Sequence, residues 1–121
     1  MSKILKIRAR QVFDSRGNPT IEAEVHSKKL SASAICPSGA STGTYEAFEK
    51  RDTKNKKYLG KSVFSAINLI NTKISKKLSG TNIHDQVRID TTLINLDGTR
   101  QKTNLGANAI LAVSMAAKKL S

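Results

Sequence analysis

The apolar residues of this chain change their spacing once, near residue 40. Before that point apolar and polar residues alternate with a period of two, which is typical of strands with one buried face. After it the apolar residues recur every three or four positions, which is typical of amphipathic helices. Strands followed by helices form the α+β pattern. We therefore expect one α+β domain over residues 1–121, in which a three-stranded antiparallel meander precedes a small helical bundle.

The expected strands of the meander are 7–13, 20–26 and 30–35. The middle one alternates most regularly, because Ile21, Ala23 and Val25 share one face and polar residues occupy the other. Residues 15–19 separate the first two strands and are rich in turn formers. Short connections between successive strands favour antiparallel hairpins.

A long apolar stripe predicts the first helix, and its members are Val63, Ile67, Ile70, Ile74 and Leu78. Ser62 is expected to cap the N-terminus of this helix, and Gly80 to end it. A second helix is expected over Asp85 to Leu96, with Val87, Leu93 and Ile94 facing inward and Asp97-Gly98 at its end.

An Ala-rich apolar face predicts a third helix from Asn104 onward. Neither a Gly cap nor a Pro follows it before Ser121, so we expect a domain truncated at its C-terminal end. With 121 residues, the chain is too short for an eight-stranded βα barrel, which needs about 200 residues or more. Aromatic residues make up 4% of the chain, so the core is expected to consist of Ile, Leu, Val and Ala.

The chain carries a formal charge of +12, with 21 basic and nine acidic residues. A basic domain can bind nucleic acid through its phosphates. Most of the basic residues are scattered lysines, however, and aromatic side chains do not alternate with them as a stacking surface requires. The pattern favours a solvated, lysine-rich surface, and a basic binding module for nucleic acid or protein stays an alternative.

The single cysteine, Cys36, cannot form an intramolecular disulfide, which favours a reducing, cytoplasmic location. Charged residues interrupt the apolar residues of the N-terminus, so the pattern does not fit a secretory signal peptide. The least polar stretch, Leu105 to Ala117, is too short to span a bilayer, and we expect no membrane partner.

Seven small residues in a row follow Pro37 between the strand region and the helix region. Such a loop lets backbone N–H groups approach an anion, and its hydroxyl and carbonyl oxygens suit a hard cation such as Mg²⁺. It lacks the lysine of a Walker A loop. The alternative is a ligand-free connection in which Thr44 caps a short helix.

The two histidines offer no local metal-binding spacing, because 58 positions separate them. His26 is expected to be an exposed strand residue and His84 to lie at the entry of a helix. Cys36 is expected to be a small packed residue at the base of the small-residue loop, since a histidine partner for a catalytic thiol is not evident.

Four separated motifs resemble segments of the enolase (phosphopyruvate hydratase) family, in the same order. They are 9–20 (ARQVFDSRGNPT), 37–43 (PSGASTG) with Glu46-Ala47 and Arg51-Asp52, 96–99 (LDGT), and 104–111 (NLGANAIL). The resemblance covers essentially all 121 positions. It implies the N-terminal domain of a Mg²⁺-dependent lyase that reversibly dehydrates 2-phospho-D-glycerate to phosphoenolpyruvate in glycolysis and gluconeogenesis.

The resemblance implies that the catalytic barrel is absent from this chain. In the family, that barrel carries the base, the acid and the carboxylates of the first metal site. We therefore expect catalytic residues to be absent from this fragment and the fragment alone to be inactive. Besides the enolase domain and the basic binding module, a third hypothesis is a structural fragment that dimerises or aggregates through the face its barrel should cover.

The same resemblance assigns roles to particular residues of this chain. The residues of the mobile substrate loop are Ser38, Gly39, Ala40, Ser41, Thr42 and Gly43, and Ser41 matches the ligand of the second Mg²⁺. Arg10 and Glu22 match positions that form ion pairs with the partner subunit of a homodimer. Family members are cytoplasmic, are also reported at the cell surface, and take part in RNA-degrading assemblies.

Overall fold

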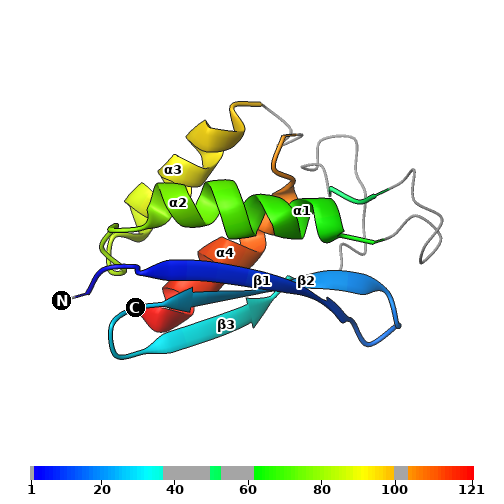
Figure 1. Ribbon diagram of the computed structural model, residues 1–121, viewed down its shortest axis with the longest axis horizontal. Helices are drawn as coiled ribbons and strands as arrows, with labels where there is room; N and C mark the ends of the chain where they lie inside the picture. The colour runs from blue at the N-terminus through cyan, green and yellow to red at the C-terminus, as the bar shows by residue number, and fades with distance from the viewer. Residues whose placement is uncertain (1, 37–49, 53–61, 100–103) are drawn as a thin grey trace.

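The computed structural model describes residues 2–36, 50–52, 62–99 and 104–121 (Figure 1). Its sheet consists of β1 (Lys6–Phe13), β2 (Pro19–His26) and β3 (Ser31–Ile35). The strands are antiparallel and lie in the order β1-β2-β3, which confirms the expected meander.

One face of the sheet is apolar and the other is polar, as the alternation predicted. Ile21, Ala23 and Val25 of β2 are fully buried on the inner face. On the outer face, the antiparallel register places Arg10 opposite Glu22 and Arg8 opposite Glu24. Opposite charges at facing positions of two strands favour this register over one that places like charges opposite each other.

A continuous helical rod runs beside β1 (Figure 1). It consists of α1 (Phe64–Leu69), the π-helical turn η2 (Ile70–Ile74) and α2 (Ser75–Leu78). All five residues of the predicted apolar stripe are buried, which confirms the helix and its orientation. The π-helical turn itself was not predicted, because one wider turn leaves the spacing of the apolar residues almost unchanged.

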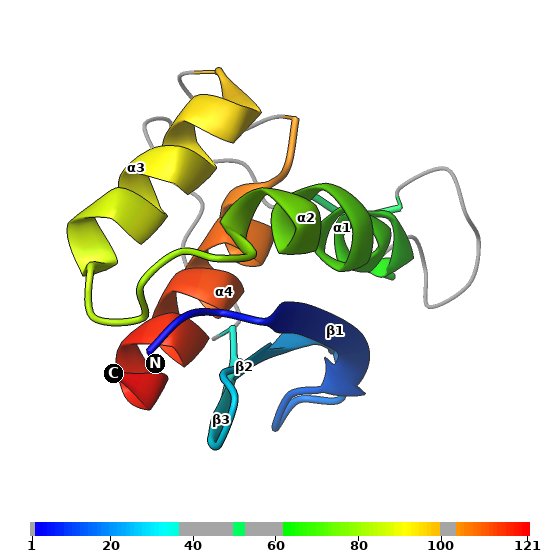
Figure 2. The ribbon, with the colours of Figure 1, turned by 60° about the vertical axis from the view of Figure 1, so that its left-hand side comes forward.

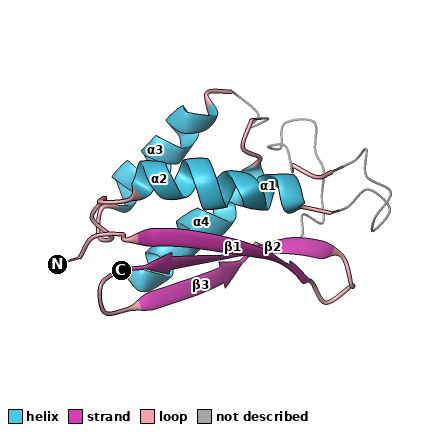
Figure 3. Ribbon diagram, in the orientation of Figure 1, coloured by secondary structure: helices cyan, strands magenta, loops and turns pink. Residues whose placement is uncertain are grey.

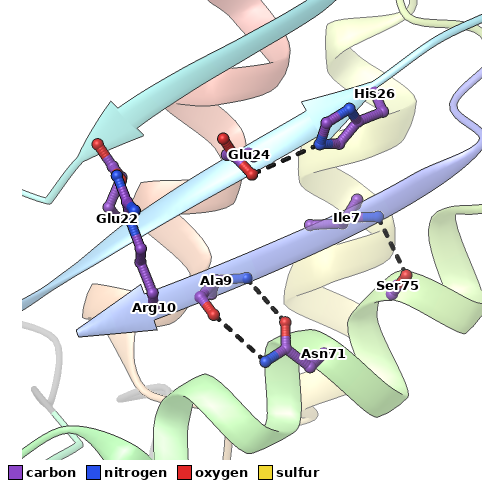
Figure 4. A network of polar contacts seen from close by, with 8 residues as sticks. All are labelled: Ile7, Ala9, Arg10, Glu22, Glu24, His26, Asn71 and Ser75. Atoms are coloured by element: carbon purple, nitrogen blue, oxygen red, sulfur yellow. Dashed lines mark hydrogen bonds and ion pairs between the residues drawn. The ribbon is translucent and has the colours of Figure 1, made fainter.

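Side chains of this rod occupy the outer edge of β1 (Figure 4). The Ile7 N–H donates to Ser75 Oγ at 3.1 Å. Asn71 contacts both backbone groups of Ala9, because Oδ1 accepts from the N–H at 2.7 Å and Nδ2 donates to the carbonyl at 3.3 Å. The edge of the sheet is thus paired at these two residues by side chains rather than by another strand.

Two further helices complete the fold (Figure 2). Helix α4 (Ala107–Leu120) packs across β2 and β3, and α3 (Gln86–Asp97) packs on α4 and the rod, away from the sheet. The core of the described residues contains Ile, Leu, Val, Ala and Cys36, as the composition predicted. Within the described ranges, the structure contains no helix long and apolar enough to cross a membrane.

The inward face of α3 differs from the prediction. Val87 is 78% exposed and Ile94 is 45% exposed, whereas Ile89 and Leu93 are fully buried. At 3.6 residues per turn, Val87 lies almost opposite Ile89 on the helix surface. The sequence did not indicate the inward face because a charged residue, Asp90, lies on it. Asp90 Oδ1 accepts a hydrogen bond from Ser114 Oγ of α4 at 2.6 Å.

The corrected orientation of α3 predicts that two substitutions in this helix differ strongly in cost. Ile89→Ala removes a fully buried side chain and should lower the free energy of unfolding by about 2–5 kcal/mol. Val87→Ala removes an exposed one and should change it by about 0.5 kcal/mol or less. Urea unfolding of both variants measures the difference. Equal destabilisation by the two would contradict the assigned face.

Candidate functional site

The predicted loop residues Ser38 to Gly43 lie outside the described residues, but the chain on both sides of 37–49 is described. On one side is Cys36, and on the other are Lys50 and Arg51. We call these three residues, together with Pro19–Ile21 at the start of β2, the stem. The stem is the part of the candidate site whose geometry the structure gives.

Cys36 is fixed at both of its backbone groups. Its N–H donates to the Ile21 carbonyl at 2.8 Å, and its carbonyl accepts from Thr20 Oγ1 at 2.8 Å. Cys36 and Thr20 are both buried, so these groups cannot exchange their partners freely for water. Cys36 is therefore the packed residue at the loop base that the sequence predicted.

Three contacts fix the other side of the stem. Arg51 Nη1 donates to the Pro19 carbonyl at 2.8 Å. The side-chain amide of Asn108, in the first turn of α4, pairs with both backbone groups of Lys50. Its Oδ1 accepts from the Lys50 N–H at 2.9 Å, and its Nδ2 donates to the Lys50 carbonyl at 3.1 Å.

Gly106 allows the backbone of Lys50 to approach α4 this closely. A Cβ on Gly106 would lie 2.5 Å from Lys50 Cβ and 3.0 Å from Lys50 N. The φ angle of Gly106 is +93°, a conformation that other residues rarely adopt. Both the space and the backbone conformation at this position therefore require glycine.

Asp52 joins the stem to the start of α1. Its carboxylate accepts from the N–H groups of Phe64 at 2.9 Å and Ser65 at 3.2 Å, so a residue distant in sequence caps this helix. The prediction that Ser62 is the N-cap was wrong, because α1 begins later and its capping residue, Val63, offers no side-chain acceptor. The Ser62 hydroxyl instead donates to Asp52 Oδ2 at 3.1 Å.

Gln11 connects the same helix start to β1. Its Oε1 accepts from the Val63 N–H at 3.0 Å and lies 3.2 Å from Ser62 Oγ. An inward-facing polar residue of the edge strand thus pairs with a backbone N–H that the first turn of a helix leaves unpaired.

Asp97 is a buried carboxylate at the end of α3, 1% exposed. Its Oδ1 accepts from the Thr99 N–H at 3.0 Å and from the Thr99 hydroxyl, and its Oδ2 accepts from the Leu105 N–H at 2.7 Å. Burial raises the pKa of this carboxyl, but the hydrogen bonds from Thr99, Leu105 and Gly106 outweigh burial and hold the pKa below its ordinary value of 3.8. Asp97 therefore holds 97–99 and 104–106 together as an anion.

The outer face of the sheet carries the two residues assigned to a subunit interface (Figure 4). Arg10 Nε lies 2.5 Å from Glu22 Oε1, with the arginine side chain 71% exposed and the glutamate 14% exposed. An ion pair with one partner this exposed contributes little to stability. Next to it, His26 Nε2 lies 3.5 Å from Glu24 Oε1, and His26 is half-buried rather than exposed as predicted.

The described residues do not group three or more His, Cys, Asp or Glu side chains in a way that could hold a metal ion. His84 is exposed before the start of α3, as the sequence predicted. The carboxylates of Asp52 and Asp97 are both engaged with backbone N–H groups. Within the described part of the chain, these carboxylates therefore hold backbone segments together and do not form a metal centre.

The described residues thus form an α+β unit of three strands followed by helices, with the stem at the start of the central strand. The family described as "Enolase, N-terminal domain" matches residues 4–121, and the chain belongs to this family. Over all of its 121 residues the chain is 90% identical to a protein named Enolase from Pelagibacter ubique (strain HTCC1062). The chain spans 29% of the length of that relative. The resemblance inferred from the four motifs is thereby confirmed.

Replacing Gly106 by alanine should destabilise the protein more than the same change at Gly80. Gly80 also has a positive φ, of +89°, but a Cβ there would meet nothing within 4 Å. Gly80→Ala therefore measures the conformational cost alone, about 1–3 kcal/mol. Gly106→Ala should cost about 1–3 kcal/mol more, because the new Cβ collides with Lys50. Chemical denaturation measures both, and equal costs would show that the close approach of Lys50 is unimportant.

Asp97→Asn should destabilise the protein at neutral pH, because the new amide places an N–H against a backbone donor. We expect a loss of about 1–3 kcal/mol. Because folding lowers the pKa of Asp97 from its ordinary value of 3.8, wild type has its full advantage over the variant above that value. The advantage should disappear as the pH falls through the lower pKa of the folded state. Urea unfolding at a series of pH values measures this, and a difference independent of pH would contradict it.

Proposed function

We propose that the full-length protein is an enolase that reversibly dehydrates 2-phospho-D-glycerate to phosphoenolpyruvate in glycolysis and gluconeogenesis. This chain would be its N-terminal domain, which carries the substrate loop. The observation that carries the proposal is the 90% identity, over the entire chain, to a protein named Enolase. We further propose that the full-length protein is cytoplasmic.

The chemistry of this reaction determines what the rest of the protein must supply. The proton next to an ionised carboxylate is barely acidic, so its removal needs a base and positive charge beside the developing oxyanion. Mg²⁺ is the proposed cofactor and would supply that charge. By the family resemblance, the base, the acid and the metal-binding carboxylates are assigned to the remainder of the protein.

The proposed contribution of this chain is the loop from Ser38 to Gly43, in which Ser41 would supply oxygen to the second Mg²⁺. Small side chains suit this role because they let backbone groups approach the substrate. The stem supports the proposal, since it fixes both ends of the segment that carries these residues. A loop that covers the substrate also excludes water from the reacting centre.

We also propose that the full-length protein is a homodimer in which Arg10 and Glu22 face the partner subunit. Support comes from their place on the outer face of the sheet, which the described helices do not cover (Figure 2). Because Arg10 is largely exposed, its guanidinium can contact a second carboxylate in addition to Glu22.

Full-length protein should convert 2-phospho-D-glycerate to phosphoenolpyruvate, whereas residues 1–121 alone should not, because the base and the first metal site would be missing. In the full-length protein, Ser41→Ala should lower kcat/KM by about 10- to 100-fold, since a contact of the metal site is lost. Ser27→Ala, in the turn between β2 and β3, is the matched control and should behave as wild type. Formation of phosphoenolpyruvate is the measurement. Turnover by residues 1–121 above that of a Ser41→Ala version of the same fragment would contradict the proposal.

A further inference from the structure

We infer that the groove between β1 and the helical rod is a docking site for an acidic, extended peptide segment of another protein, whose carboxylates meet Lys6 and Arg8. The groove has a volume of about 410 Å³, and the residues that line it are Lys6, Ile7, Arg8, Ala9, Asn71 and Ser75. This interaction goes beyond the proposed function and does not depend on it.

The acidic side chains of the described residues are engaged within the domain, which leaves an excess of exposed positive charge. Of the nine acidic residues, Glu46 and Glu49 lie outside the described ranges. Each of the others contacts a backbone N–H or another side chain of the domain, and they are Asp14, Glu22, Glu24, Asp52, Asp85, Asp90 and Asp97. The charge that the described surface offers to a partner is therefore mainly positive, and an acidic partner complements it.

Lys6 and Arg8 carry part of this excess on the outer face of β1, and both are exposed. Arg8 faces Glu24 across the strand pair, but within the described ranges the ion-pair partner of Glu24 is His26. Neither Lys6 nor Arg8 forms an ion pair within those ranges. Both cations are therefore available to carboxylates of a partner, and the guanidinium can bind one through two parallel hydrogen bonds.

The helical rod supplies the other wall of the groove (Figure 4). Asn71 pairs with the backbone of Ala9, and Ser75 Oγ accepts from the Ile7 N–H. Because these N–H groups of the strand edge are already occupied, a peptide in the groove is recognised through its side chains rather than as an added strand. Within the described ranges Ser75 Oγ donates no bond, so its O–H can donate to a carboxylate.

The spacing of the two cations favours an extended peptide. Lys6 and Arg8 are alternate residues of one strand, so their side chains leave the sheet about 6.5–7 Å apart on the same face. Carboxylates at alternate positions of an extended peptide have the same spacing. A single-stranded nucleic acid fits less well, because its bases bind by stacking on aromatic side chains, and the residues that line the groove include none.

The test measures binding to the full-length protein by fluorescence anisotropy at low salt. The probe is a labelled peptide in which Glu and Ser alternate. A second peptide carries the same number of glutamates at every third position and tests the spacing, and a labelled single-stranded RNA of equal charge tests the other class of partner.

Three double variants are compared with wild type. Lys6→Gln/Arg8→Gln removes both cations of the groove, whereas Lys6→Arg/Arg8→Lys retains the two charges. Lys29→Gln/Arg88→Gln is the matched control, because it removes one exposed lysine and one exposed arginine from the turn after β2 and from α3.

We expect the alternating peptide to bind more tightly than the second peptide. Lys6→Gln/Arg8→Gln should weaken its binding about three- to 20-fold, the effect of two lost ion pairs, and the other two variants should stay within about twofold of wild type. The inference would be overturned if the alternating peptide did not bind, if both peptides bound equally, or if the control variant weakened binding as much. RNA that bound more tightly than the peptide, and lost affinity in Lys6→Gln/Arg8→Gln, would overturn it in favour of nucleic acid.

Discussion

The hydrogen-bonding capacity of β2 is the constraint on which the rest of the structure depends. Its backbone pairs with β1 on one side and with β3 on the other. A buried strand cannot leave its polar groups without partners. At the start of β2, residues from later in the chain supply the donors for the carbonyls of Pro19 and Ile21. Cys36 donates to the Ile21 carbonyl and Arg51 to the Pro19 carbonyl, and these bonds hold both residues beside β2.

The parts of the fold that could be predicted from the sequence are those where burial imposes a period. The meander followed from the alternation in β2, and the helical rod followed from its apolar stripe, because each pattern has a single inward face. Helix α3 is the exception. The inward face of α3 includes Gln86 and Asp90, which form hydrogen bonds with Ser114 of α4. Polar residues therefore lie on the buried side, whereas the apolar Val87, which led to the wrong inward face, is exposed.

Less of the candidate site than of the fold could be predicted from the sequence. The resemblance assigned Ser41 and its neighbours, which lie outside the described residues, whereas the loop residues taken alone favoured a ligand-free connection. The contacts of Asp52 with the start of α1 and of Asn108 with Lys50 were missed, because both side chains act on groups that only the tertiary fold brings near them. A signal for Asn108 was present, since a polar residue in the first turn of an apolar, Ala-rich helix requires a buried partner.

The pairing of Asn71 and Ser75 with β1 has a consequence for how this domain behaves while it is being synthesised. An open strand edge is a template for intermolecular pairing, and a nascent chain exposes such edges before its later residues exist. Here the β1 edge is occupied at Ile7 and Ala9 by side chains of the helical rod, so this protection requires residues up to 75 to have been synthesised and folded. Growth of amyloid-like stacks from this end of the sheet would first have to displace a helix. In the described part of the domain, β3 is therefore the edge where misassembly would begin, and there Lys119 Nζ donates to the Ser33 carbonyl.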